Sequence, residues 1–369
     1  MAGNLFTFFL FYELLTLTTW PLVVHNGTPE ALAAGRSYLR YTLTGSVLFL
    51  AGVVWLYGLN GSVEFTPGGA LGGLGEEHAV SLRVIFALMV VGMGVKAALV
   101  PLHGWLPKAM VAPAPVSALL HAVAVVKAGA FALIRLVEDV YGFERVCELG
   151  LQLPLMIVAA VTIVFGSVRA LQQTSIKKRL AFSTVSQVSY IVLGIATGGL
   201  LATAGGMVHL VHQGLMKITL FFCAGVFGLV LGVYRVHELD GMGYRAPWTS
   251  ACFTVAAIGM IGVPPVAGFI TKWYIGAGAV AVGQHWVIAI LVASALLNAM
   301  YFLPLVRRMW LVRPPQGAGR AEYVGTIEHL ALVGSAVVTA TASLGIALGA
   351  AHRLSPLNWV LRIAGEYFT

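Results

Sequence analysis

The chain has 369 residues, of which 59% are hydrophobic and only 10% are charged. A soluble globular domain carries about 25% charged residues, so this composition excludes an ordinary soluble protein. The net charge of +8 comes without a separate basic domain or an RNA-binding motif, which argues against nucleic acid as a partner. We therefore expect an all-α polytopic membrane protein, because helices satisfy the backbone hydrogen bonds that lipid cannot.

The hydropathy pattern predicts about ten transmembrane helices, each near or above the roughly 20 residues that cross a bilayer. They lie at about 3–25, 38–59, 80–100, 116–137, 151–170, 180–200, 203–231, 249–280, 285–306 and 327–350. The last residues, Ser355–Phe368, form an amphipathic stretch that we expect to lie on the membrane surface.

Two of the predicted spans contain prolines that should interrupt them. The third runs into Pro101 and Pro107, and the eighth contains Pro264 and Pro265. Proline removes a backbone donor and clashes one turn back, so both helices should break, either as a packing kink or at a functional cavity. Two broken helices in separate halves suggest a duplicated transporter fold with inverted repeats. We divide the chain into 1–140, 150–312, and a last span with tail at 325–369.

The distribution of charge in the loops sets the orientation. If the N-terminus lies outside and the spans alternate, most lysines and arginines fall on one side, which is then the cytoplasmic side. The acidic residues lean the other way and include Glu138 and Asp139. The basic net charge is therefore explained by topology.

Ionisable residues inside the spans carry the functional prediction. Lys96, Lys127, Lys217, Lys272 and Glu13 all fall within apolar segments. A lysine at bilayer depth costs roughly 2.5–3.5 kcal/mol, so such residues usually mark an ion path. The alternatives are snorkelling to the interface, which would suit the first and last lysines, and a structural ion pair with Glu13. The two central lysines fit neither alternative easily.

Buried lysines suit proton transfer, because burial disfavours the charged form and lets the amine release a proton near neutral pH. His209, Gln213 and Lys217 follow at i, i+4 and i+8, so they line one helix face. His121 lies one to two turns before Lys127. A lone buried histidine is usually a core residue, but several histidines that share helices with lysines predict a proton relay.

Other chemistry finds no support in the sequence. The three cysteines have no metal-type spacing, and no dinucleotide fingerprint, phosphate-binding loop or haem-attachment motif is present. We expect no cofactor, no metal and no catalytic centre in the chain itself.

Residues 95–110, with the sequence VKAALVPLHGWLPKAM, and residues 112–121, APAPVSALLH, resemble the signature of the antiporter-like proton-conducting subunits. This family spans respiratory complex I, the multisubunit Mrp Na⁺/H⁺ antiporters and membrane-bound hydrogenases. Four further stretches agree in order along the chain: 11–14, 176–187, 209–217 and 262–272.

The resemblance implies a role for each ionisable residue. Glu13 and Lys96 would be the coupled pair of the first half-channel, and Lys177 would link the two halves. The implied relay consists of Glu13, Lys96, His121, Lys127, Lys177, His209, Gln213, Lys217 and Lys272.

The chain departs from the family pattern in three ways. Gln213 stands where the family usually has histidine, and Ser175 stands where an acid commonly precedes the lysine pair. Family members have about fourteen helices, and this chain begins with a segment similar to their fifth. Either another chain supplies the missing helices, or the core suffices, or the sequence is a fragment. We expect a partner membrane polypeptide against residues 3–25; the alternative is that neighbouring helices of the chain itself shield Glu13.

The function expected is translocation of H⁺ or Na⁺ by one subunit of a larger complex, with other membrane subunits and lipid as neighbours, in an energy-transducing cell inner (plasma) membrane. That complex could be an oxidoreductase of the NADH:quinone or hydrogenase type, which leaves enzyme membership open. The alternatives are a stand-alone transporter for another solute and a non-conducting scaffold subunit.

Overall fold

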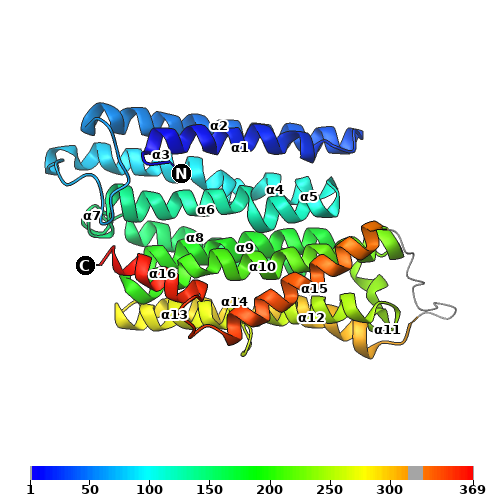
Figure 1. Cartoon of the computed structure of the whole chain (residues 1–369). Helices are drawn as coiled ribbons and strands as arrows, with labels where there is room; N and C mark the ends of the chain where they lie inside the picture. The colour runs from blue at the N-terminus through cyan, green and yellow to red at the C-terminus, as the bar shows by residue number, and fades with distance from the viewer. Residues whose placement is uncertain (1, 315–326, 369) are drawn as a thin grey trace.

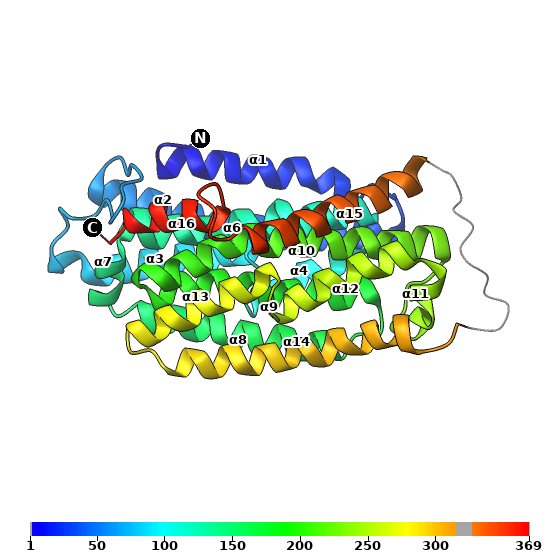
Figure 2. The same cartoon turned by 60° about the horizontal axis from the view of Figure 1, so that its bottom comes forward.

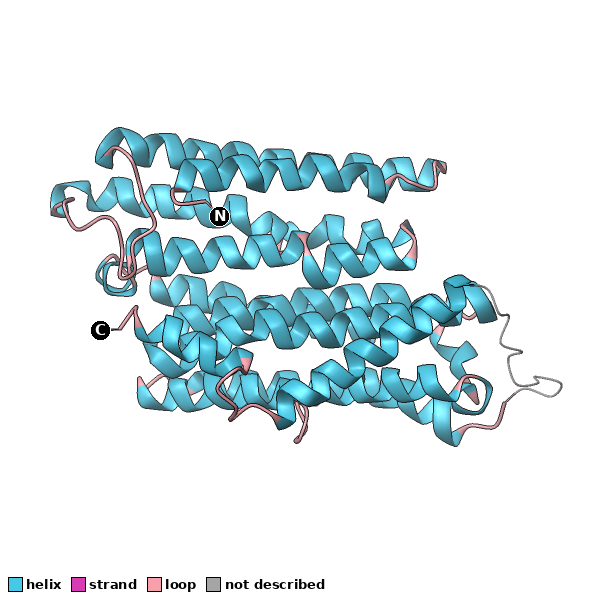
Figure 3. Ribbon diagram, viewed as in Figure 1, coloured by secondary structure: helices cyan, strands magenta, loops and turns pink. Residues whose placement is uncertain are grey.

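The computed structural model of the protein describes residues 2–314 and 327–368. In this part of the chain the only strand-like pairings are two isolated bridges, Asn4 with Glu64 and Ser175 with Arg235. All other regular structure is helical, and the long helices lie side by side along one axis (Figures 1 and 3). The predicted all-α class is confirmed.

The helices of the first half are α1 (Leu5–Val23), α2 (Pro29–Asn60), α3 (Ala79–Lys96), α4 (Trp105–Lys108), α5 (Ala114–Ala118), α6 (Val125–Arg135) and α7 (Phe143–Glu148). The second half contains α8 (Gln152–Leu171), α9 (Ile176–Thr197), α10 (Gly199–Leu231), α11 (Met242–Arg245), α12 (Pro247–Ile261), α13 (Ala267–Ala281) and α14 (Trp286–Leu311). The helices α15 (Ile327–Leu348) and α16 (Pro356–Gly365) follow. Nine helical stretches within the described residues are long and apolar enough to cross a membrane, and the tenth predicted span is the divided pair α12 and α13.

Local sequence signals explain where several helices begin. The side chain of Asn4 accepts a hydrogen bond from the Thr7 amide at 2.7 Å, which caps α1. The hydroxyl of Thr28 accepts from the Ala31 amide at 3.2 Å, and Pro29 occupies the first turn of α2. Gly198, with φ of 77°, separates α9 from α10 because that conformation suits glycine.

Both predicted breaks are present. α3 ends at Lys96, five residues before the first proline of the motif, because Pro101 has no amide hydrogen to bond the Ala97 carbonyl and its ring would clash there. The second break lies between the end of α12 at Ile261 and the start of α13 at Ala267. Gly262 turns the chain there with φ of 88°.

The fourth span is also irregular, which the sequence did not predict. A π-helical turn covers Leu119–Val123, and the helix is interrupted at Ala124 before α6 resumes. A second π-helical segment, Leu136–Tyr141, ends the span. Such turns are rare and occur often at functional sites, so this span is a candidate for function along its whole length.

The prediction for the C-terminal tail was wrong. α16 packs against α10 and runs along the bundle in the direction of the spans, rather than flat on a membrane surface (Figures 1 and 2). Its apolar side contributes Leu357 and Ala364, which are buried. The amphipathic pattern of α16 therefore results from a helix whose apolar side packs against the bundle.

The centre of the bundle is α9, which is buried from Arg179 to its end at Thr197. It packs between α8 and α10, and α10 in turn contacts α12, α13 and α15. Arg179 holds the start of α9 in place because its guanidinium donates to the carbonyls of Leu171, Gln173 and Tyr301 at 2.7–3.3 Å. A helix without a lipid-facing side can carry polar side chains through the membrane.

Candidate functional site

The first site residues lie where α1 meets the break at the end of α3. The Nζ atom of Lys96 is 3.3 Å from Oε1 of Glu13, and it also donates to the Tyr12 carbonyl and lies 3.4 Å from the centre of the Tyr12 ring. Lys96 is 1% exposed, whereas the side chain of Glu13 is 19% exposed. The structure thus brings together the two residues that the sequence analysis paired.

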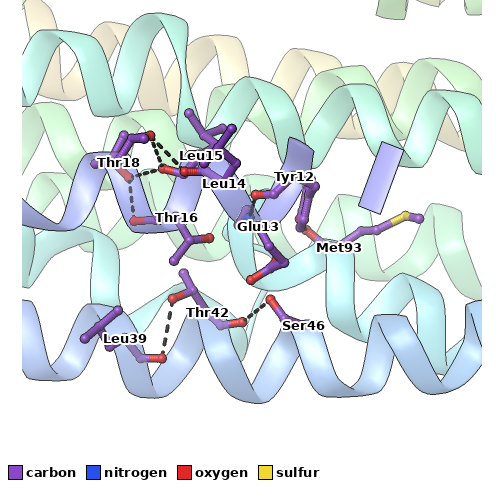
Figure 4. A network of polar contacts seen from close by, with 12 residues as sticks. Tyr12, Glu13, Leu14, Leu15, Thr16, Thr18, Leu39, Thr42, Ser46 and Met93 are labelled. Carbon is purple, nitrogen blue, oxygen red and sulfur yellow. Dashed lines mark hydrogen bonds and ion pairs between the residues drawn. The ribbon is translucent and has the colours of Figure 1, made fainter. Parts of the chain in front are cut away.

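Glu13 sits in polar surroundings within an otherwise apolar helix pair. Its side chain points from α1 toward α2, where Thr42 and Ser46 lie, with Thr16 beside it on α1 (Figure 4). Further along the same interface, the hydroxyls of Thr19 and Tyr38 are 2.8 Å apart. Hydroxyl groups at this interface can support a carboxylate or a chain of water molecules.

Lys127 and His121 occupy the irregular fourth span. Nζ of Lys127 is buried and has no hydrogen-bond partner among the described residues, and the same holds for both ring nitrogens of His121. Lys127 lines a groove of about 590 Å³ between α6 and α10, with Phe131 and Leu210 in its walls. A buried amine without a protein partner is costly, so this site is suited to an amine that becomes neutral or binds water.

Lys217 is the most enclosed of the lysines. It is 0% exposed and lies on α10. Its amine donates to the Leu180 carbonyl at 3.1 Å and to the hydroxyl of Ser183, both on α9. No carboxylate lies within 4 Å of it in the described part of the chain, so a proton on Lys217 is held by neutral groups alone.

Two histidines of α10 contact neighbouring helices. Nε2 of His209 is 3.2 Å from Oε1 of Gln187 on α9, and Nδ1 of His212 is 3.2 Å from the hydroxyl of Thr271 on α13. Gln213, which stands where the family usually has histidine, is fully buried, and neither atom of its amide has a partner among the described residues. The centre of α10 therefore contains buried amide and imidazole atoms without a hydrogen-bond partner among the described residues.

Lys272 lies on α13 at the second helix break. Its amine donates to the carbonyl of Ile261, the last residue of α12, at 2.6 Å and lies 5.4 Å from the centre of the Tyr190 ring. The Tyr190 ring is in turn 5.5 Å from His209. Lys272 also lines a groove of about 410 Å³ between α13 and α14.

The resemblance includes Lys177 in the relay, but the structure places it at the edge of the bundle rather than in its interior. It is the second residue of α9, is half-buried, and lines a cleft of about 1070 Å³ that also contains Arg36, Arg40, Lys108 and Arg169. Its amine donates to the Ala112 carbonyl at 3.0 Å, so it does join the second half of the chain to the first. Lys177 is at the helix end, where the basic cleft opens, and this position explains the difference.

The site residues lie close enough to influence one another. The charges of Lys127 and Lys217 repel each other, His121 lies within electrostatic range of Lys217 and Lys177, and His209 lies within range of Lys127 and Lys272. Gly129 places the backbone of α6 directly against Lys96, because a Cβ atom there would lie 2.6 Å from the Lys96 carbonyl carbon. The ionisable groups of the fourth span, α9, α10 and α13 therefore lie within electrostatic range of their neighbours, and α6 packs directly against the end of α3 that carries Lys96.

Sequence reasoning missed several polar groups that complete the site. Ser183 and Gln187 on α9 contact Lys217 and His209 of α10, and Thr271 on α13 contacts His212. Glu138 and Asp139 resemble ordinary loop charges in the sequence, yet both are 1% exposed. A run of hydroxyl and amide side chains within an apolar span was the available signal for the α9 residues.

No group of three or more metal-ligating side chains that could hold an ion is found among the described residues. A bundle of parallel spans with two helix breaks, each adjoined by a lysine, and a row of buried amines and imidazoles defines an antiporter-like membrane subunit. Residues 2–298 match the family described as "NADH:quinone oxidoreductase/Mrp antiporter, TM", and the chain belongs to this family.

The chain is similar to two sequence relatives and to one solved structure. It is 38% identical over 326 residues to an NADH-quinone oxidoreductase subunit of Desulforudis audaxviator, covering 87% of this chain and 64% of that protein. It is 28% identical over 298 residues to a Na⁺/H⁺ antiporter subunit of Alkalihalophilus pseudofirmus, covering 81% and 60%. The fold matches a chain of the Mrp complex from Dietzia sp. with a TM-score of 0.86 at 24% identity, covering 99% and 74%. The chain thus spans less than two thirds of the length of these two sequence relatives.

Proposed function

We propose that the protein translocates H⁺ or Na⁺ across a membrane, along the row of Lys, His and Glu side chains, as one subunit of a multisubunit complex. The observation that carries this proposal is Lys217, a fully enclosed amine between two helices with no carboxylate partner in the described residues. A structural lysine in lipid would need a counter-charge or a route to the interface, and this residue has neither.

The arrangement also offers routes for ions. Lys127, Lys177 and Lys272 each line a groove or cleft, whereas Lys217 lies between them in the enclosed part of the bundle. Protons can then pass between amines and imidazoles through hydroxyl groups and water. The relatives support the same activity, since one is named as part of a Na⁺/H⁺ antiporter and the other as part of a quinone oxidoreductase.

The test replaces Lys217 with methionine, which keeps the length of the side chain and removes the amine. We expect proton or Na⁺ flux in reconstituted liposomes to fall by about a hundredfold while the protein still inserts and assembles. Lys178→Met is the matched control, because that lysine is exposed at the start of α9. Unchanged flux in Lys217→Met would refute the relay. Measurement with Na⁺ and H⁺ gradients separately identifies the ion.

We further propose that a helix of another membrane subunit packs against residues 3–25. The outward face of α1 presents Phe6, Leu10, Leu14 and Leu17, each about half exposed, and Glu13 lies beside this face with 19% of its side chain still accessible. A carboxylate open to lipid is costly, so a protein neighbour suits this position better than lipid does. The relatives are named as subunits, and this supports a complex in an energy-transducing plasma membrane.

Cysteine cross-linking tests this neighbour. We expect Leu10→Cys and Leu17→Cys to cross-link within the membrane to one defined subunit that copurifies in mild detergent. Leu296→Cys, equally exposed on α14, is the control for random collision. A chain that is isolated as an ion-conducting monomer without cross-links would contradict the proposal.

A further inference from the structure

Two adjacent carboxylates at the end of the fourth span are buried but lie outside the relay described above. Glu138 and Asp139 fall in the π-helical segment Leu136–Tyr141, and each is 1% exposed. Asp139 has a counter-charge, because Arg135 lies 3.0 Å from its carboxylate, and Tyr367 lies within interaction range of it. Asp139 is therefore accounted for as a structural ion pair.

Glu138 is not accounted for in this way. Its Oε1 atom accepts a single hydrogen bond, from the hydroxyl of Thr203 at 3.3 Å. Its Oε2 atom is buried and has no partner among the residues that the structure describes. A buried carboxylate with one weak donor is costly as an anion, whereas the protonated acid is neutral and can itself donate.

The position of Glu138 connects it to the relay through two helices. It lies eleven residues after Lys127 on the same span, which is about three helical turns. Thr203 lies in the first turns of α10, the helix that also carries His209 and Lys217. The end of the tail lies beside this site, because Tyr367 is within electrostatic range of Glu138 and Asp139, and the ring of Phe368 is 6.1 Å from that of Phe143 in α7.

The surrounding charges favour a proton over a metal cation at this position. Arg135 is part of the cluster and repels a cation, and the one hydrogen bond to Glu138 within the described residues comes from the hydroxyl of Thr203. A proton can bind the carboxylate without further oxygen ligands. The titratable groups that face Glu138 are Asp139 and Tyr367, and Arg135 is paired with Asp139.

We propose that Glu138 is a proton-binding site through which the relay exchanges protons with the membrane face opposite the basic cleft. This inference rests on the proposed function. Glu138 takes up or releases the proton, and Thr203 orients its carboxyl group. Asp139 and Arg135 keep the neighbouring backbone in place, and the tail closes the site from the side.

The test compares Glu138→Gln with Glu144→Gln in the full chain, purified with the membrane subunits that it retains and reconstituted into liposomes. Glu144 is an exposed acid on the same side of the bundle. We expect proton flux to fall about tenfold or more in Glu138→Gln, and to stay within about twofold in the control. Flux within about twofold of the unsubstituted protein in a correctly assembled Glu138→Gln variant would overturn the proposal.

A second readout does not depend on flux. Infrared difference spectra between acid and alkaline buffer should contain the carbonyl band of a buried protonated carboxyl group, and this band should be absent in Glu138→Gln. If that variant does not assemble, Glu138→Asp replaces it, and the band should shift in frequency. A spectrum that either substitution leaves unchanged would refute the site. Because Lys217→Met tests the relay separately, failure of Glu138 leaves the proposed function standing.

Discussion

The pair of Glu13 and Lys96 permits a quantitative test of what holds the first half of the bundle together. Two unit charges 3.3 Å apart attract each other by about 5 kcal/mol at an effective dielectric constant of about 20. The side chain of Glu13 is 19% exposed, so solvent reduces this value, and we expect a coupling free energy of about 2–3 kcal/mol. Glu13→Gln alone should be the costly change, because it leaves the enclosed lysine without a counter-charge.

The measurement is a double-mutant cycle with Glu13→Gln, Lys96→Met and the combined variant, followed by denaturant titration in mild detergent. The control is the pair of Arg308 and Asp240, which is closer at 2.8 Å but more exposed, at 38% and 28%. Its coupling should stay below about 1 kcal/mol, as exposed ion pairs do. If the coupling of Glu13 with Lys96 does not exceed that of the control pair, burial does not govern the strength of this interaction and the reasoning fails.

Two further predictions concern the packing around the site. A Cβ atom at Gly129 would lie 2.2 Å from the Ala97 amide nitrogen, so Gly129→Ala should destabilise the protein by about 2–3 kcal/mol and lower ion flux. The control Gly345→Ala, with open space around the added methyl group, should do neither. Equal melting temperatures of the two variants would contradict this prediction. Arg179→Gln removes the donors that hold three carbonyls, so the free energy of unfolding should fall by about 3 kcal/mol. Flux per folded molecule should stay unchanged, and a selective loss of flux would place Arg179 in the ion path instead.

The spans and both helix breaks could be predicted because hydropathy and proline act locally along the chain. The end of α3 at Lys96 follows from Pro101, whose effect reaches one turn back. The pairing of Glu13 with Lys96 was also accessible, since each lies within an apolar span and the family pattern places them together.

Other features depend on contacts that are distant in sequence. Glu138 resembles a loop charge because it lies at the end of a hydropathy segment, and only the packing of α10 and the tail encloses it. The π-helical turn at Leu119–Val123 has no proline to signal it. A sequence motif does not report where a cleft opens, so the position of Lys177 at the basic cleft could not be predicted.

The way in which the lysines are held has a consequence for the speed of proton transfer. Lys96, Lys177, Lys217 and Lys272 all donate to a backbone carbonyl, of Tyr12, Ala112, Leu180 and Ile261 respectively. A neutral amine still has hydrogens to donate, so it can keep such a bond after it has lost its proton. A lysine that is held only by a carboxylate would lose most of its electrostatic attraction to that carboxylate when it gives up its proton. Anchoring to the backbone therefore keeps each amine in place through both charge states, and little of the surrounding protein has to reorganise for each proton that passes.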